Sequence, residues 1–197
     1  GSVIGGIQLN GFYNNGANAA LNLTQRAVVN DRGVGVCSPT DTAGICGGKA
    51  WSGDTDEIDN VDNAESLRLT PQGGFKFTGV FGLSSLDNNG GAPNETGYVT
   101  WSGGSVQFSR SGATVVSGAT SATLSSWNPP YGGEGNTFLL TIVGGGIENA
   151  ADVTFFAGCL QGSCGTNNDY LVAGAAVVPL PAALPMFLSA LAGLGLV

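Results

Sequence analysis

Short runs of alternating apolar and polar residues, separated by turns rich in glycine, asparagine and serine, recur along most of this chain. Ser66–Thr70 is the clearest run, with Leu67 and Leu69 at every second position. A period of two places alternate side chains on one face of a strand. Turn signals every 8–12 residues or so are typical of sandwiches and barrels. We therefore predict an all-β fold, an antiparallel, jelly-roll-like β-sandwich over residues 1–176. The expected strands are 3–9, 21–29, 66–70, 75–83, 97–101, 105–110, 113–117, 119–125, 136–143, 153–159 and 170–178.

The composition excludes several classes of function. The chain has 34 glycines, only six lysines and arginines, no histidine and a formal net charge of −8. This charge would repel nucleic acid and supplies no basic patch for an anionic membrane surface. Without histidine, a Ser–His or Cys–His nucleophile is excluded, and the sequence lacks phosphate-loop and dinucleotide fingerprints. We therefore expect a protein that is not an enzyme and binds no nucleic acid.

Residues 177–197 differ from the rest of the chain because they contain no charged residue. A helix of about 20 apolar residues spans the hydrocarbon core of a bilayer. Three prolines lie within residues 179–185, so an uninterrupted helix is expected from about Leu184 onward. The small residues Ala190, Gly193 and Gly195 would allow close packing against another membrane helix. We predict a C-terminal transmembrane anchor; a buried strand or helix of the globular body is the alternative.

The start of this tail carries a recognisable motif. Val178, Pro179, Leu180, Pro181 and Ala182 precede the short apolar stretch. This arrangement resembles the VPLPA type of PEP-CTERM sorting signals of Gram-negative bacteria, which are read by exosortase, a membrane-embedded processing enzyme. The resemblance covers about the last tenth of the chain and implies export, with the body outside the inner membrane. Tails of that family finish in a basic cluster, whereas no lysine or arginine follows the motif in residues 183–197.

Four cysteines form two closely spaced pairs, Cys37 with Cys46 and Cys159 with Cys164. Three pairings are possible, and closure within each pair is the simplest. Such disulfides need an oxidising compartment, which agrees with export. Zinc binding is the competing interpretation, but these spacings without a histidine make a poor zinc site.

An acidic segment offers a candidate metal site. Calcium takes six to eight oxygen ligands or so, and carboxylates supply them readily. The spacing does not match an EF-hand, because Ile58 stands where the third ligand would be. The alternative is a solvated acidic loop. The candidate calcium ligands are Asp54, Asp56, Glu57, Asp59 and Asp62.

Aromatic residues suggest a second kind of site. Trp127 and Tyr131 lie in one Pro-containing loop and could offer flat faces to sugar rings. The alternative is that Trp101 belongs to the core, while Trp127 and Tyr131 pack a loop through their apolar bodies.

Together these features predict an exported, non-enzymatic protein with a β-sandwich at 1–176 and a membrane anchor at 177–197. We expect a structural or adhesive role in the cell envelope or extracellular matrix, on the periplasmic side of the inner membrane or at the cell surface. One alternative is an accessory subunit docked on a larger membrane complex by its C-terminal helix. A further alternative is a carbohydrate-binding module. The expected partners are the membrane, an exosortase-type processing enzyme and an envelope polysaccharide or a membrane protein complex.

Overall fold

A computed structural model describes residues 2–13, 16–25, 32–37, 58–60, 64–86, 95–128, 136–162 and 168–179 of the chain. These segments form fourteen strands and one short 3-10 helix, and every strand pair among them is antiparallel. The all-β, antiparallel prediction is therefore confirmed. The elements are β1 (Ser2–Ile4), β2 (Ile7–Tyr13), β3 (Ala17–Gln25), β4 (Arg32–Cys37), β5 (Ile58–Asp59), β6 (Ser66–Pro71), β7 (Phe75–Ser84), β8 (Thr96–Trp101), β9 (Gly104–Ser109), β10 (Gly112–Ser117), β11 (Ala119–Ser126), β12 (Phe138–Gly144), η1 (Ile147–Asn149), β13 (Val153–Ala157) and β14 (Asp169–Pro179).

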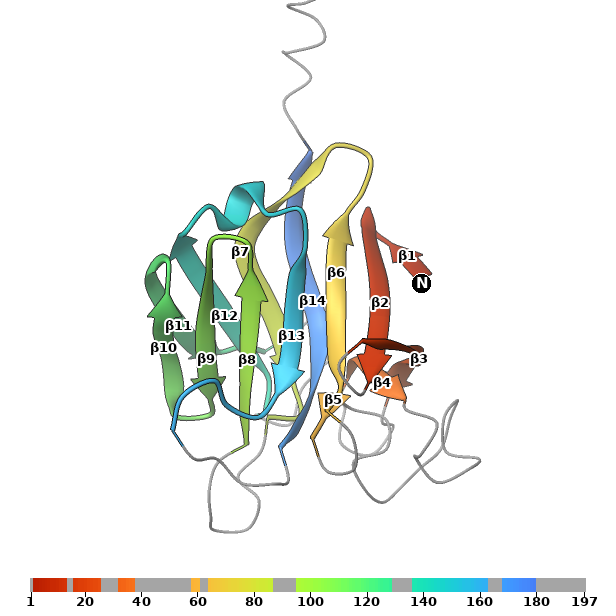
Figure 1. Cartoon of the computed structure of the whole chain (residues 1–197), viewed down its shortest axis with the longest axis horizontal. Coiled ribbons are helices and arrows are strands. Elements are labelled where there is room, and N and C mark those ends of the chain that lie inside the picture. The colour runs from red at the N-terminus through yellow and green to blue at the C-terminus, as the bar shows by residue number, and fades with distance from the viewer. Residues whose placement is uncertain are drawn as a thin grey trace, which may run out of the picture.

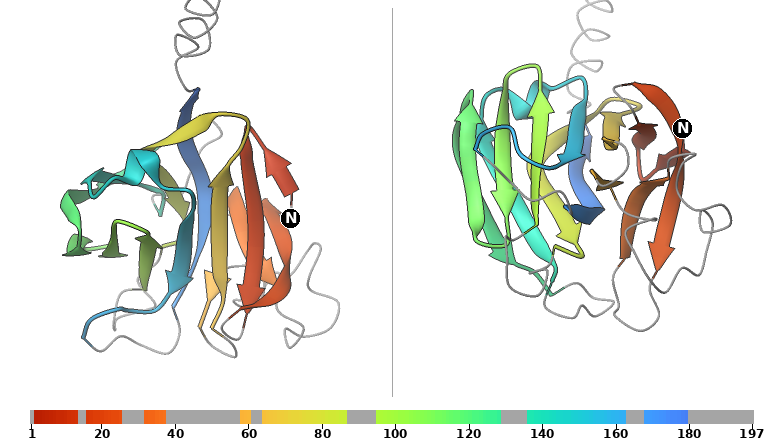
Figure 2. Two further views of the ribbon diagram at one scale, coloured as in Figure 1. Left: turned by 45° about the horizontal axis from the view of Figure 1, so that its top comes forward. Right: turned by 60° about the horizontal axis from the view of Figure 1, so that its bottom comes forward.

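The strands lie in two layers that face each other (Figures 1 and 2). The front sheet has the order β10-β9-β8-β13-β6-β2, with β1 paired to β2. The back sheet has the order β4-β14-β7-β12-β11. Strand β3 joins the layers, because residues 17–19 pair with β2 and residues 20–25 pair with β4. The apolar positions of both layers therefore point into the space between them.

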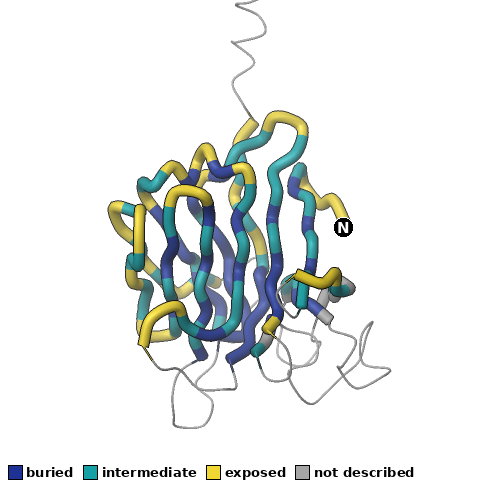
Figure 3. Tube along the Cα trace, viewed as in Figure 1, coloured by how far each residue is buried: buried dark blue, intermediate teal, exposed yellow. Residues whose placement is uncertain are grey.

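The alternating sequence pattern explains why most strands form where they do. Along β8 the buried residues are Gly97, Val99 and Trp101, and the residues between them are partly exposed. Burying every second side chain stabilises such a strand by removing apolar surface from water. Figure 3 shows a similar alternation of buried and partly exposed positions on β2 and β13 of the front sheet.

The N-terminal prediction was wrong in one respect. Residues 3–9 were expected to form a single strand, but the structure has a hairpin of β1 and β2. The turn consists of Gly5 and Gly6, whose φ angles of 55° and 81° lie in the left-handed region that glycine adopts easily. Strand β2 then continues to Tyr13, beyond the strand end expected at residue 9.

A chain of aromatic rings fills the space between the sheets. Phe81 of β7 contacts Phe155 of β13 edge-on, with ring centroids 5.2 Å apart. Phe155 lies 6.5 Å from Phe108 of β9, and Phe108 lies 5.3 Å from Tyr170 of β14. Phe77 extends the chain along β7, 5.7 Å from Phe81. The chain of rings crosses from the back sheet to the front sheet between Phe81 and Phe155 and returns between Phe108 and Tyr170, so this packing holds the two layers together.

Tyr170 also forms a hydrogen bond within this core. Its hydroxyl donates to the backbone oxygen of Phe156 at 3.1 Å, and the side chain is fully buried. Burial raises the pKa of Tyr170 well above its usual 10.0, because the phenolate would lose its hydration. The folded state therefore favours the neutral phenol more strongly than the unfolded chain does.

We expect Tyr170→Phe to lower the free energy of unfolding by about 1 kcal/mol at pH 8, because the hydrogen bond is lost. Above pH 10 or so the unfolded chain binds fewer protons than the folded one, so wild-type stability falls as the pH rises. Urea unfolding between pH 8 and pH 11 should show a shallower alkaline decline for the variant. An equal decline in both proteins would contradict the assignment of this proton to Tyr170.

Gly79 in β7 and Gly73 in the β6–β7 turn both have positive φ angles, 81° and 62°. A Cβ at Gly79 would overlap the backbone oxygen of Ile142, whereas one at Gly73 would meet nothing within 4 Å. We expect Gly73→Ala to destabilise by about 1–2 kcal/mol through strain alone. Gly79→Ala should cost roughly 2–6 kcal/mol, because overpacking adds to the strain. Thermal melting measures both; equal losses would argue against the tight approach of β7 to β12.

Candidate functional site

The predicted sorting motif begins inside the back sheet. Val178 and Pro179 of β14 lie opposite Lys76 and Phe75 of β7. The sheet therefore extends beyond the boundary expected at residue 176. Leu180, Pro181 and Ala182 lie outside the described residues, as does the expected anchor helix. Within the part of the chain that the structure describes, no helix is long and apolar enough to cross a membrane.

Short turns surround the end of the sheets at which β14 finishes (Figure 1). The β6–β7 turn is fixed by hydrogen bonds from the Gln72 amide to the Gly6 carbonyl, at 2.7 Å, and from the Phe75 amide to the Gln72 carbonyl, at 3.1 Å. The ammonium group of Lys76 donates to the Asn149 side-chain oxygen at 2.7 Å, which connects β7 to η1. These contacts make the tail-bearing end compact.

Of the five predicted calcium ligands, the structure describes only Asp59, and of that residue only the backbone. Asp54, Asp56, Glu57 and Asp62 lie outside the described residues. Asp59 belongs to β5, where its backbone pairs with Asp169 of β14, but its side chain is not among those described. The side chains that are described contain no group of three or more potential metal ligands. The calcium site stays a prediction.

A buried amide connects three strands at the opposite end of the sheets. Asn168, only 1% exposed, precedes β14. The backbone N–H of Asn168 donates to the Asn60 side-chain oxygen at 3.0 Å. The side-chain oxygen of Asn168 accepts from the backbone N–H of Thr96 at 2.9 Å. The Thr96 carbonyl in turn accepts from the Gly158 amide at 2.8 Å. This network fixes the starts of β8 and β14 beside β5.

Three buried carboxylates lie at or next to the starts of strands, and sequence reasoning did not single them out as a group. Glu65 precedes β6, Glu95 precedes β8 and Asp169 begins β14; their exposed fractions are 2%, 2% and 5%. Each of the three residues takes part in an interaction within the fold. The sequence signal is an acid directly before an alternating apolar run. We interpret these carboxylates as structural groups that fix strand ends.

One of the predicted disulfide cysteines is bonded in the structure. Cys159 takes part in a disulfide. Its loop is attached to β9 by Gln107, whose side-chain oxygen accepts from the amides of Leu160 and Gln161 at 2.8 and 3.0 Å. Cys46 and Cys164 lie outside the described residues, and of Cys37 only the backbone is described, in β4. The pairing of the four cysteines therefore stays a prediction.

The tryptophans occupy different environments. Trp101 is a core residue, 8% exposed, and its indole N–H donates to the Gly145 carbonyl at 2.7 Å. Trp127 is partly buried with its ring against Gly82 of β7, where an added Cβ would lie 2.8 Å from the ring. Tyr131 lies outside the described residues, so a joint glycan contact of Trp127 and Tyr131 stays a prediction.

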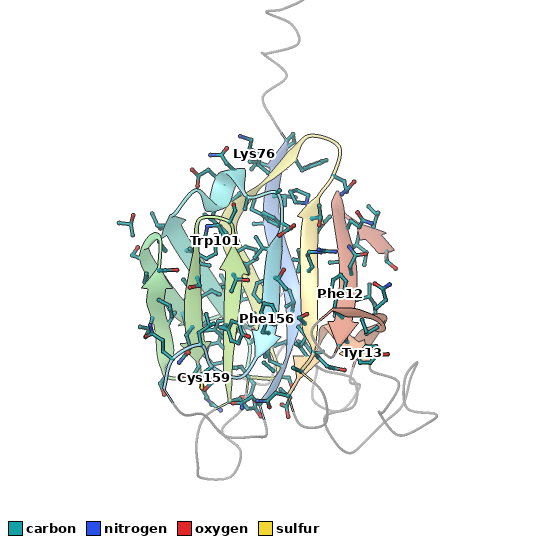
Figure 4. All side chains as sticks on the ribbon, in the orientation of Figure 1. Phe12, Tyr13, Lys76, Trp101, Phe156 and Cys159 are labelled. Atoms are coloured by element: carbon teal, nitrogen blue, oxygen red, sulfur yellow. The ribbon has the colours of Figure 1, made fainter. Side chains whose placement is uncertain are left out.

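The outer face of the front sheet carries an aromatic group that sequence analysis missed. Tyr98 of β8 lies opposite Phe156 of β13, and their rings stack at 4.7 Å with an interplanar angle of 10°. Beyond β13 the next two strands of the sheet are β6 and β2. There the guanidinium carbon of Arg68 in β6 lies 4.6 Å from the ring centroid of Phe12 in β2. All four residues are partly exposed. We refer to Tyr98, Phe156, Arg68 and Phe12 as the aromatic row; Figure 4 shows Phe156 and Phe12 on the same side of the sheet.

Burial also affects the tyrosine of the aromatic row. Desolvation raises the pKa of Tyr98 above its usual 10.0. The phenol therefore stays neutral at physiological pH and can both donate and accept hydrogen bonds. The sequence signal for the row was present in the adjacent Phe155 and Phe156, because consecutive residues of a strand face opposite sides.

Comparison of the chain with protein-family models, curated proteins and solved structures gives no match.

Proposed function

We propose that this chain is an exported, membrane-tethered structural or adhesive protein of the cell envelope or extracellular matrix. The observation that carries this proposal is the path of β14, which lies between β4 and β7 in the back sheet and enters the sorting motif without a linker. A tail inserted in a membrane would therefore hold the body close to the lipid surface. The uncharged, apolar sequence of residues 180–197, which follows β14, supports such insertion.

The disulfide of Cys159 supports a location outside the cytoplasm, because disulfides persist in oxidising compartments. The resemblance of residues 178–182 to VPLPA-type signals supports export and an exosortase-type enzyme as a processing partner. Both lines lead to the periplasmic side of the inner membrane or the cell surface as the site of action.

The body is, in this proposal, a jelly-roll-like sandwich. Support comes from the path of the chain, which crosses from one sheet to the other between β6 and β7, between β12 and β13 and between β13 and β14. Such repeated crossing is a property of jelly rolls. A rigid body of this kind suits display of surfaces and binding better than a hinged catalytic cleft.

A second candidate is an accessory subunit of a larger membrane complex, favoured by the small residues Ala190, Gly193 and Gly195 in the apolar stretch. The mass of the mature protein separates the two functions. A processed structural protein should lack the residues that follow the motif, whereas a resident subunit should retain all residues through Val197.

Leu191→Arg should release the exported full chain from the membrane fraction, because arginine at the centre of a spanning helix costs about 2.5–3.5 kcal/mol. Leu160→Arg is the matched control, since Leu160 is a leucine of the body that is already 42% exposed. Carbonate extraction and fractionation measure the result. Retention of the Leu191→Arg protein in the membrane would overturn the tether.

A further inference from the structure

We propose that the aromatic row binds a polysaccharide whose sugars carry carboxylate groups, that is, a uronate-containing polymer. This inference gives the adhesive role a partner and rests on the proposed function to that extent. The site is made by strands β8, β13, β6 and β2 in the middle of the front sheet, away from the tail.

The row is set by strand register. Tyr98 lies opposite Phe156, Phe156 lies opposite Ser66, and Ser66 lies opposite Phe12. Neighbouring strands are about 4.8 Å apart, so Phe156 and Phe12 are separated by roughly 9–10 Å across the small Ser66. Arg68 lies on β6, the strand between them. The stacked pair of rings and the ring of Phe12 therefore lie two strand spacings apart, with the cation of Arg68 on the strand between them. This separation is comparable to the length of sugar units in a polysaccharide.

Arg68 has donors that no described residue uses. Within the described part of the chain the only interaction of its side chain is the cation–π contact with Phe12, and the guanidinium forms neither an ion pair nor a hydrogen bond there. Stacking on an aromatic ring fixes the guanidinium plane and leaves its N–H groups available. Guanidinium donors match the two oxygens of a carboxylate in a bidentate contact. The group is therefore preorganised for a carboxylate.

The surroundings of Arg68 suit sugar hydroxyls. Thr154 and Asn10 lie directly opposite Arg68 on the neighbouring strands, and Thr100 lies opposite Thr154. Hydroxyl and amide side chains both donate and accept hydrogen bonds. The stacked rings of Tyr98 and Phe156 add apolar surface that can cover the C–H groups of a sugar ring.

Charge sets how the row would hold such a polymer. The chain has a net charge of −8 with six lysines and arginines, so it repels polyanions in general, and a polyphosphate or nucleic acid needs many cations. A uronate polymer is also a polyanion, so its preference for the row rests on one local contact, the bidentate pairing of a single carboxylate with the guanidinium of Arg68. The other contacts of the row are with uncharged parts of the sugars.

A protein partner fits the row less well. Large apolar residues that are strongly exposed mark many protein interfaces. Among the described residues these are Val3, Ile4, Val143, Leu160 and Val178. None of them belongs to the aromatic row, which combines partly exposed rings with neutral polar side chains.

The test measures binding of the full chain to polygalacturonate by calorimetry, in a polyoxyethylene detergent that has no sugar headgroup. Dextran of similar length is the neutral reference polymer. We expect binding to polygalacturonate only, and a loss of roughly tenfold to a hundredfold in affinity for Arg68→Gln. Phe156→Thr should also weaken binding, because it removes one of the stacked rings.

Arg110→Gln is the matched control, because Arg110 is an exposed arginine in the β9–β10 turn, outside the row. It should bind as the wild type does. Arg68→Lys keeps the charge without the forked donors and should bind with intermediate affinity; it serves as the second variant if Arg68→Gln does not fold. Melting curves report folding separately from binding.

Three results would overturn the inference: no binding of polygalacturonate by the wild type, equal binding of dextran, or equal effects of the Arg68 and Arg110 substitutions. Membrane fractionation is independent of this assay. Loss of polymer binding with an intact tether would therefore reject the ligand and leave the proposed function standing, while the reverse result would reject the tether alone.

Discussion

Aromatic packing between the two sheets is the interaction on which the rest of the structure depends. Phe77 and Phe81 project from the back sheet, Phe155 and Phe108 from the front sheet, and Tyr170 from β14. Edge-to-face and tilted contacts of this kind add about 0.5–1.5 kcal/mol per pair to the gain from burial. With no long helix among the described residues to cover either sheet, the sheets cover each other, and the rings determine how closely they approach.

Strand β13 connects this core to the outer surface. Phe155 faces the interior, and the next residue, Phe156, stacks on Tyr98 outside. The backbone oxygen of Phe156 accepts the hydrogen bond of Tyr170, which belongs to the strand that carries the sorting motif. The same few residues therefore fix the core, the aromatic row and the origin of the tail. A substitution in the row can be separated from a change in the core only when stability is measured alongside binding.

The sequence was informative where one strand could be considered by itself. Alternation located β6, β8 and β12 closely, and Trp101 lies in the core, one of the two environments weighed for it. Features that depend on pairing between distant strands were not predictable, because register is set by the whole sheet. The partnership of Tyr98 with Phe156 is an example, since 58 positions separate them in the sequence but they lie opposite each other in register.

The candidate sites also differ in whether they depend on local sequence or on pairing between distant strands. The acidic segment and the cysteine pairs are local patterns, so sequence analysis found them, although the side chains of the acidic segment lie outside the described residues. Arg68 looked like an ordinary outward residue of an alternating strand. Its stacking on Phe12 requires β2 to pair with β6, although more than 40 residues lie between those strands. Long-range pairing of this kind leaves no signal within either strand.

Strand direction relates the proposed binding face to the proposed tether. The aromatic row crosses β8, β13, β6 and β2, so it runs at a large angle to the strands. Strand β14 is antiparallel to its neighbours and leads toward the tail along the strand direction (Figure 1). A polymer lying along the row would therefore run across the direction of β14. If copies of the chain lie side by side, as the proposed tether would arrange them, one polymer strand could bind several copies, and single sites would combine into firmer attachment.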